Sequence, residues 1–109
     1  MAIKKHNKKD PRCFVENTIG VIGGKWTVLI VKELLEGKKR FGEMSRALVG
    51  ISPRTLSLRL SELESDGVIS KKIFPEVPLH VEYKLTKQGL ALVTILNQMH
   101  KWGEKYKRK

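Results

Sequence analysis

Cysteine, long apolar stretches and acidic side chains are all scarce in this chain of 109 residues. The single cysteine, Cys13, excludes an intrachain disulfide, and a chain without a disulfide framework is typical of the cytoplasm. No apolar run approaches the ~20 residues of a membrane span, and no signal peptide pattern follows the first lysines. We therefore expect one cytoplasmic domain without a membrane partner.

Patterns of catalytic and metal-binding residues are missing as well. We expect His6, His80 and His100 to lack both a partner one helical turn away and a nearby carboxylate, so neither a zinc site nor a nucleophile–base pair is predicted. The glycines near residue 23 lack the spacing and the Lys-Ser/Thr pair of a phosphate-binding loop. The sequence predicts a non-enzyme with no catalytic residue, no metal and no cofactor.

Positive charge is what the chain has in excess, with 22 basic against 11 acidic residues and a net charge of +11. Such a chain attracts polyanions. Most of the excess lies at the ends, since residues 1–12 and 101–109 each carry five basic side chains and one acidic side chain. We expect a basic arm at 1–12, a single domain at 13–106 and a basic tail at 107–109. These ends either contact phosphates or only keep the chain soluble.

Helical periodicity dominates the first half of the chain. Apolar side chains recur at helical spacing in residues 14–22, 26–35 and 41–48, and glycines follow each segment. The second segment is apolar nearly all round, which predicts a buried central helix. Residues 38–40 are expected to form a short exposed connector.

A further helix has a strong start at Ser52 and Pro53. A serine hydroxyl caps free backbone N–H groups, and proline loses nothing at the first helical position. The stripe Leu56, Leu60 and Leu63 predicts its buried side. Because the turn at residues 49–51 is short, this helix and the one before it form a predicted helix-turn-helix.

The apolar period changes from 3.6 to 2 after residue 67. Residues 79, 81, 83 and 85 are apolar and alternate with polar ones, which predicts a half-buried strand with residues 68–74 as its antiparallel partner. The proline-rich loop 75–78 should project as a stiff flap. The pattern predicts a mostly helical α+β fold, a winged helix-turn-helix with a two-stranded wing.

The last predicted helix, which Thr86 caps and which runs to about Tyr106, carries two apolar faces. One holds Leu92, Leu96 and Met99; the other holds Ala91, Ile95, Trp102 and Tyr106. Either the first helix or a second copy covers the spare face, and we favour the second copy because exposed aromatics are uncommon on monomers. This C-terminal dimerisation helix gives an expected interface of Phe14, Ile95, Met99, Trp102 and Tyr106.

Double-stranded DNA is the ligand that this arrangement suits, since a helix fits the major groove. The helix that starts at Ser52 and Pro53 has an expected base-reading face of Arg54, Ser57, Leu58 and Ser61, flanked by Thr55 and Arg59. An arginine can pair with guanine and an outward leucine can contact a thymine methyl; an ordinary solvated face is the alternative. The candidates for phosphate contact, each otherwise a generic surface charge, are Lys25, Arg40, Lys71, Lys72 and His80.

Cys13 is the one residue with reactive potential. Its expected position near the first turn of a helix, beside Arg12, favours the thiolate, because free N–H groups and a cation both stabilise negative charge. The alternative is an inert cysteine that acts as a small hydrophobe.

Several motifs follow one another along about 90 of the 109 residues: Cys13 to Ile22, Gly23-Gly24-Lys25-Trp26-Thr27, Arg40-Phe41, Ile51-Ser52, Leu63-Glu64-Ser65-Asp66-Gly67, Val77-Pro78, Val81-Glu82-Tyr83, Leu85-Thr86, Gly89 and Trp102. Together they resemble the HxlR-type winged-helix transcriptional regulators. The resemblance implies a dimer built by the first and last helices and a palindromic operator as ligand. It also implies a sensor of oxidants or electrophiles at Cys13. Without a second cysteine, an intersubunit Cys13–Cys13 bond, a mixed disulfide and alkylation all remain open.

The sequence therefore predicts a dimeric, sequence-specific regulator of transcription that binds double-stranded DNA as a repressor, with a small effector or an oxidant as a further partner. A small basic protein that coats nucleic acid, or a protein-interaction module without an operator, is the alternative.

Overall fold

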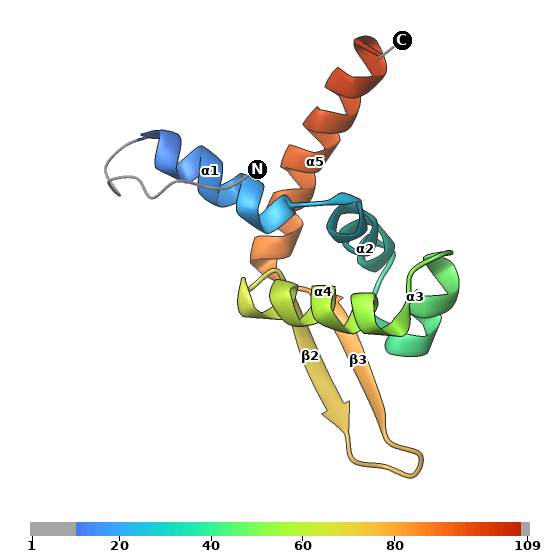
Figure 1. Ribbon diagram of the computed structural model, residues 1–109. Coiled ribbons are helices and arrows are strands. Elements are labelled where there is room, and N and C mark those ends of the chain that lie inside the picture. Colours follow the sequence, from blue (N-terminus) through green and yellow to red (C-terminus); the bar gives the residue numbers. More distant parts are fainter. Residues whose placement is uncertain (1–10, 108–109) are drawn as a thin grey trace.

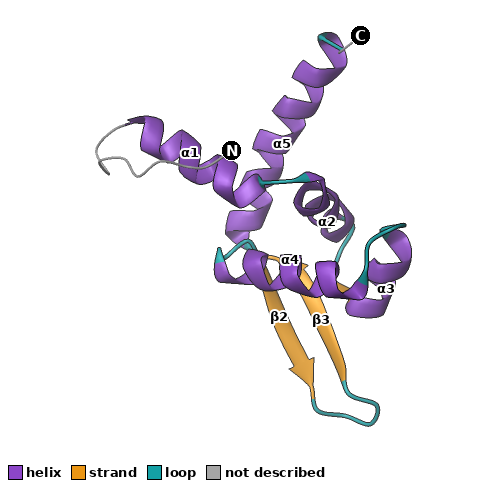
Figure 2. Cartoon of the chain, in the orientation of Figure 1, coloured by secondary structure: helices purple, strands orange, loops and turns teal. Residues whose placement is uncertain are grey.

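The computed structural model describes residues 11–107, and side chains from Phe14 onward (Figure 1). His6 and most of the predicted basic arm lie outside this range, as do residues 108–109. Within it the chain forms five helices and three strands (Figure 2). In chain order they are α1 (Pro11–Ile22), α2 (Lys25–Leu35), β1 (Lys39–Arg40), α3 (Phe41–Ala47), α4 (Pro53–Ser65), β2 (Ile69–Phe74), β3 (His80–Leu85) and α5 (Lys87–Lys105).

Caps and glycines set the ends of α4 as the sequence predicts. Ser52 Oγ accepts a hydrogen bond from the Thr55 amide at 3.1 Å, and Pro53 is the first helical residue. Gly67 follows the C-cap with a φ of 77°, a conformation that favours glycine. The chain therefore enters and leaves this helix at fixed points.

The core forms around α2, whose Ile30 and Val31 are fully buried. The predicted stripe of α4 packs into the same core, since Leu56, Leu60 and Leu63 are each at most 1% exposed. Leu92 and Leu96 of α5 join it from another side. The helix-turn-helix, α3 with α4, is thus anchored to the rest of the domain through buried leucines.

The sheet has three antiparallel strands in the order β1-β3-β2. The long hairpin of β2 and β3 is the predicted wing. The expectation that residues 38–40 form only a connector is wrong, because Lys39 and Arg40 pair with Tyr83 and Glu82 as a short edge strand. Two charged residues carry no apolar alternation, so this strand depends on backbone pairing with β3 that the sequence pattern does not reveal.

The wing and α5 extend from opposite ends of the core (Figure 1). This explains a radius of gyration of 15.5 Å, compared with about 13 Å for a compact chain of this length. From Asn97 to Lys107 every residue of the chain is exposed. None of the helices in the described range is both long and apolar enough to span a membrane.

Candidate nucleic-acid interface

The outward side of α4 is the first part of the candidate interface. Its members, opposite the leucine stripe, are all exposed: Arg54, Ser57, Leu58 and Ser61. Leu58 is 54% exposed, an unfavourable position for a leucine unless a partner covers it. No ion pair holds Arg54 among the described residues. This face combines a free guanidinium, two hydroxyls and an apolar side chain.

The residues that flank this face are already engaged. Arg59 Nη1 lies 2.6 Å from Glu62 Oε1, and Thr55 Oγ1 accepts a hydrogen bond from Ser52 Oγ at 2.9 Å. Both Thr55 and Arg59 are half-buried. Arg54 is therefore the arginine of α4 that is available to a ligand.

Lys25 lies near the turn of the helix-turn-helix. Its ammonium group is 4.8 Å from the centre of the Trp26 ring. That ring packs beside the turn, within 4.0 Å of the site of a Cβ at Gly50. The Lys25 ammonium group therefore lies near the turn that precedes α4, beside the Trp26 ring.

The wing has two faces of different character. On a β-ribbon, cross-strand partners share a face. We call the face with Ile69, Lys71 and Ile73 opposite Leu85, Tyr83 and Val81 the inner face. It turns toward α4, because Lys71 Nζ lies 3.8 Å from Glu64 Oε1 of that helix. The outer face holds Ser70, Lys72 and Phe74 opposite Lys84, Glu82 and His80.

The predicted phosphate contacts of the wing are consequently separated. Lys71 lies on the inner face, whereas Lys72 and His80 lie on the outer face. Lys72 Nζ is 5.0 Å from the centre of the Phe74 ring. Lys71 therefore cannot contact the same strand of DNA from the same face as Lys72 and His80.

Tyr83 stands on the inner face next to Lys71 and Glu64. Burial raises the pKa of its phenol, and the Glu64 carboxylate raises it further. The phenol therefore stays protonated and keeps its O–H donor beside the base of the wing.

His80 does not fit the expectation that it lacks a nearby carboxylate. Its Nδ1 lies 3.9 Å from Glu76 Oε2, four residues earlier, and its Nε2 lies 3.5 Å from Glu82 Oε2. The imidazole also stacks on Phe74, with ring centres 4.5 Å apart. Glu82 lies two residues further along the same strand, on the same face, which the predicted strand already implies; Glu76 belongs to the loop and is brought to the ring by the folded hairpin.

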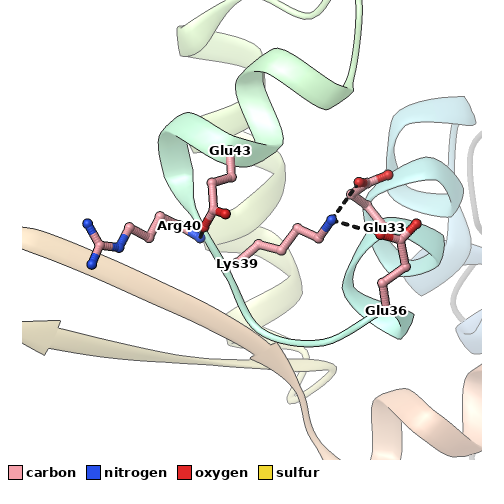
Figure 3. A network of polar contacts seen from close by, with 5 residues as sticks. All are labelled: Glu33, Glu36, Lys39, Arg40 and Glu43. Atoms are coloured by element: carbon pink, nitrogen blue, oxygen red, sulfur yellow. Dashed lines mark hydrogen bonds and ion pairs between the residues drawn. The ribbon is translucent and has the colours of Figure 1, made fainter.

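The side chains of Arg40 and Lys39 on β1 differ in their contacts. Lys39 Nζ donates to Glu33 and Glu36, each at 2.9 Å, so the pKa of its ammonium is raised by these hydrogen bonds (Figure 3). The Arg40 amide donates to Glu43 Oε1 at 2.8 Å at the start of α3, and the guanidinium points away from these carboxylates (Figure 3). Arg40 remains available to a ligand, whereas Lys39 ties β1 to α2.

An apolar surface covers the exposed sides of α1 and α5. All residues of the predicted dimer interface are exposed: Phe14 64%, Ile95 44%, Met99 53%, Trp102 67% and Tyr106 54%. Met99 lies on the same side of α5 as Leu92 and Leu96 but is exposed, because the helix extends beyond the edge of the core at this point. Val15 and Ile19, at 61% and 53%, extend the surface along α1; the helical spacing of these two residues with Phe14 is the sequence signal that would have added them. Exposed apolar patches of this kind mark interaction surfaces.

Cys13 is the third residue of α1 and so lies in its first turn, as predicted. Over the described range, no group of three or more histidine, cysteine or acidic residues is arranged to hold a metal ion.

Known proteins match this chain along most of its length. The HxlR-like helix-turn-helix family matches residues 21–109. The uncharacterised HTH-type transcriptional regulator YdeP of Bacillus subtilis is 46% identical over 95 residues, 87% of this chain and 74% of that protein. An uncharacterised HTH-type transcriptional regulator of Methanothermobacter thermautotrophicus is 44% identical over 94 residues, 86% of this chain and 72% of its own.

Solved structures share the fold as well. The redox regulator HypR in its reduced form has a TM-score of 0.78 and 45% identity, covering 84% of this chain and 90% of that one. The reduced form of the transcriptional regulator YodB from B. subtilis has a TM-score of 0.79 and 32% identity, covering 91% and 95%. These matches confirm the winged helix-turn-helix and the prediction of a non-enzyme. The chain belongs to the HxlR-like helix-turn-helix family of DNA-binding transcriptional regulators.

Proposed function

We propose that the protein is a homodimeric repressor that reads a palindromic operator with one α4 helix in each half-site. The exposed face of α4 carries this proposal, because Leu58 is 54% exposed between hydroxyl side chains and a free Arg54. Such a face suits base edges: the arginine can pair with a guanine, and the leucine can cover a thymine methyl.

Phosphate contacts complete the proposed complex. Ser52 and Pro53 begin α4, where free backbone N–H groups favour a phosphate. Lys25 lies over Trp26, whose ring is near Gly50 in the turn before α4, and Lys71 lies 3.8 Å from Glu64 near the other end of the helix. Thr55 and Arg59 would orient neighbouring side chains more than read bases, since both have partners within the chain. Arg40, Lys72 and His80 stay predicted phosphate contacts for DNA that reaches the outer face.

The proposed reading role is tested by selecting binding sites from random duplexes with the purified protein. We expect Arg54→Ala to weaken binding to the selected operator by about 1–3 kcal/mol while nonspecific binding changes less. Lys25→Ala is the matched control, because removing a cation that pairs with a phosphate weakens both kinds of binding alike. Equal losses for Arg54→Ala on both duplexes in a salt-controlled mobility-shift titration would contradict base reading.

The dimer is proposed from the exposed surface of α1 and α5. Trp102 and Tyr106, with ring centres 5.2 Å apart, form its largest aromatic group. Ile95→Glu should give a monomer in sedimentation, because a carboxylate then faces the partner, and it should weaken binding to a two-site operator more than to a half-site. A Lys101→Glu variant serves as charge control. A wild-type chain that sediments as a monomer at micromolar concentration would exclude the dimer.

A second proposed activity is oxidant sensing through Cys13. HypR is named a redox regulator, and a thiol in the first turn of a helix is favoured as thiolate. We expect Cys13→Ser to bind DNA as the wild type does but to lose the response to diamide or a quinone. Mass spectrometry of the treated protein would distinguish an intersubunit disulfide, a mixed disulfide and an alkylated thiol. A Cys13→Ser variant that still responds would make the cysteine structural.

A further inference from the structure

A pocket lies on the outer face of the wing, on the side of the sheet that turns away from α4. Apart from Tyr83, which the register places on the inner face, its lining residues are Lys38, Ser70, Lys72, Phe74, Glu82 and Lys84, around about 150 Å³ of free space. A cavity of that volume accepts a molecule of roughly benzene size, whereas drug-sized ligands need about 300 Å³ or more. The pocket therefore suits a small ligand only.

The charges in this pocket are unbalanced. Three ammonium groups surround one carboxylate, and that carboxylate is already engaged: Glu82 lies 3.4 Å from Lys38 Nζ and 3.5 Å from His80 Nε2. Lys72 and Lys84 have no carboxylate partner within residues 11–107. Arg40 is the neighbour of Glu82 on β1 and adds another cation to this face. Two ammonium groups and the Ser70 hydroxyl are thus left for an anion.

A duplex held by α4 reaches these lysines only where it extends to the outer face of the wing. The inner face of the wing turns toward α4 through Lys71 and Glu64, so a duplex on α4 would lie on that side. The pocket opens on the opposite side of the ribbon. Its basic side chains are therefore available to a separate ligand whenever DNA contacts only the inner side of the wing.

We propose that this pocket binds a small anion with two or more negative charges, such as a phosphate group or a short dicarboxylate. The anion would accept hydrogen bonds from the ammonium groups of Lys72 and Lys84 and from the Ser70 hydroxyl, in place of water. The negative charge of Glu82 lowers the affinity of the pocket for any anion. We therefore expect a singly charged anion to bind weakly.

Binding of such an anion would connect two parts of the domain. Lys38 belongs to the segment between α2 and β1, whereas Ser70, Lys72 and Lys84 belong to the wing. An anion shared by these residues would fix the wing relative to the helix-turn-helix. This consequence for DNA binding rests on the function proposed above; the binding of the anion itself does not.

The test uses the full chain without DNA, titrated with inorganic phosphate and with malonate at constant ionic strength and followed by amide chemical shifts. We expect saturable shifts confined to residues 38, 70–72 and 82–84. Lys72→Gln and Lys84→Gln should each lower the affinity about tenfold, whereas Lys32→Gln, a change of an exposed lysine on α2, should not. Glu82→Gln should raise the affinity, since it removes the competing negative charge.

Two results would overturn the proposal. One is a set of shifts spread over all the basic segments, with equal weakening by Lys32→Gln, which would indicate general ion screening. The other is no binding of either probe, together with a uniform loss of duplex affinity and a weaker salt dependence for Lys84→Gln. That second result would assign the lysines to DNA phosphates instead.

Discussion

Gly89 shows how closely α5 approaches the backbone of Val68, the residue before β2. A Cβ at this position would collide with the carbonyl oxygen of Val68 and would lie 3.1 Å from Leu85 Cδ2. The Val68 carbonyl cannot retreat easily, because it also accepts hydrogen bonds from the Thr86 amide and hydroxyl. The absence of a side chain at residue 89 therefore allows α5 to pack directly against the backbone of Val68.

We predict that Gly89→Ala lowers the free energy of unfolding by about 2 kcal/mol or more, as overpacking against backbone does. Gly103→Ala is the control, because a Cβ there has nothing within 4 Å. That change should raise stability by about 0.5 kcal/mol through helix propensity. Urea denaturation at one protein concentration measures both, and a Gly89→Ala protein as stable as the wild type would contradict the close approach.

At the scale of the elements, Ser52 has two roles, because it caps α4 and also lies at the end of that helix proposed to contact DNA. Its hydroxyl caps α4, and it is exposed at the end of the helix proposed to meet DNA. Capping and DNA contact make different demands on this position: an N-cap accepts either a hydroxyl or a carboxylate, whereas DNA phosphates repel the carboxylate.

We predict opposite effects for two changes at this residue. Ser52→Ala should lower stability by about 1 kcal/mol because the cap is removed, with a small effect on DNA affinity. Ser52→Asp should keep the stability but weaken binding to every duplex. Thr86→Ala, which removes the cap of α5, should lower stability without any specific effect on DNA binding. If Ser52→Asp binds DNA as the wild type does, this end of α4 lies away from the phosphates.

Helices and strands were predictable from the sequence wherever the pattern within one segment, such as a cap or an apolar period, was enough to define them. The start of α4 follows from Ser52 and Pro53, and its buried side follows from three leucines at helical spacing. The short strand β1 was not predictable, since Lys39 and Arg40 pair only through their backbones. The two carboxylates beside His80 differ in this respect. Glu82 lies two residues along the same strand, so the predicted alternation already places it on the face of His80, whereas Glu76 reaches the ring only through the path of the loop. Contacts made across strands depend on register, which no single segment encodes.

The charge of the whole molecule is distributed between its ends and its folded body. Residues 1–10 and 107–109 together hold seven basic side chains and one acidic side chain. The face of α4 that is proposed to read bases contains Arg54 as its one available cation within the described residues. Affinity and sequence choice thus depend on different parts of the chain.

We predict that removing residues 1–10 and 107–109 lowers the affinity for every duplex and makes it less dependent on salt. The logarithmic slope should fall by about 0.9 for each phosphate that the shortened chain no longer neutralises. The ratio of operator binding to nonspecific binding should stay the same. A titration at several salt concentrations measures both. Loss of that ratio would favour the alternative of a protein that coats nucleic acid without an operator.

The two-sided wing also limits how the gene for this protein can change. Side chains alternate between the inner and outer faces of the ribbon, so inserting or deleting one codon within β3 would exchange the faces from that point onward. Lysines and carboxylates would then turn toward α4, and apolar residues would turn to the opposite side. Length changes in the loop at residues 75–79 leave the pairing of Phe74 with His80 intact. Related genes should therefore vary in length at this loop and keep the spacing within both strands.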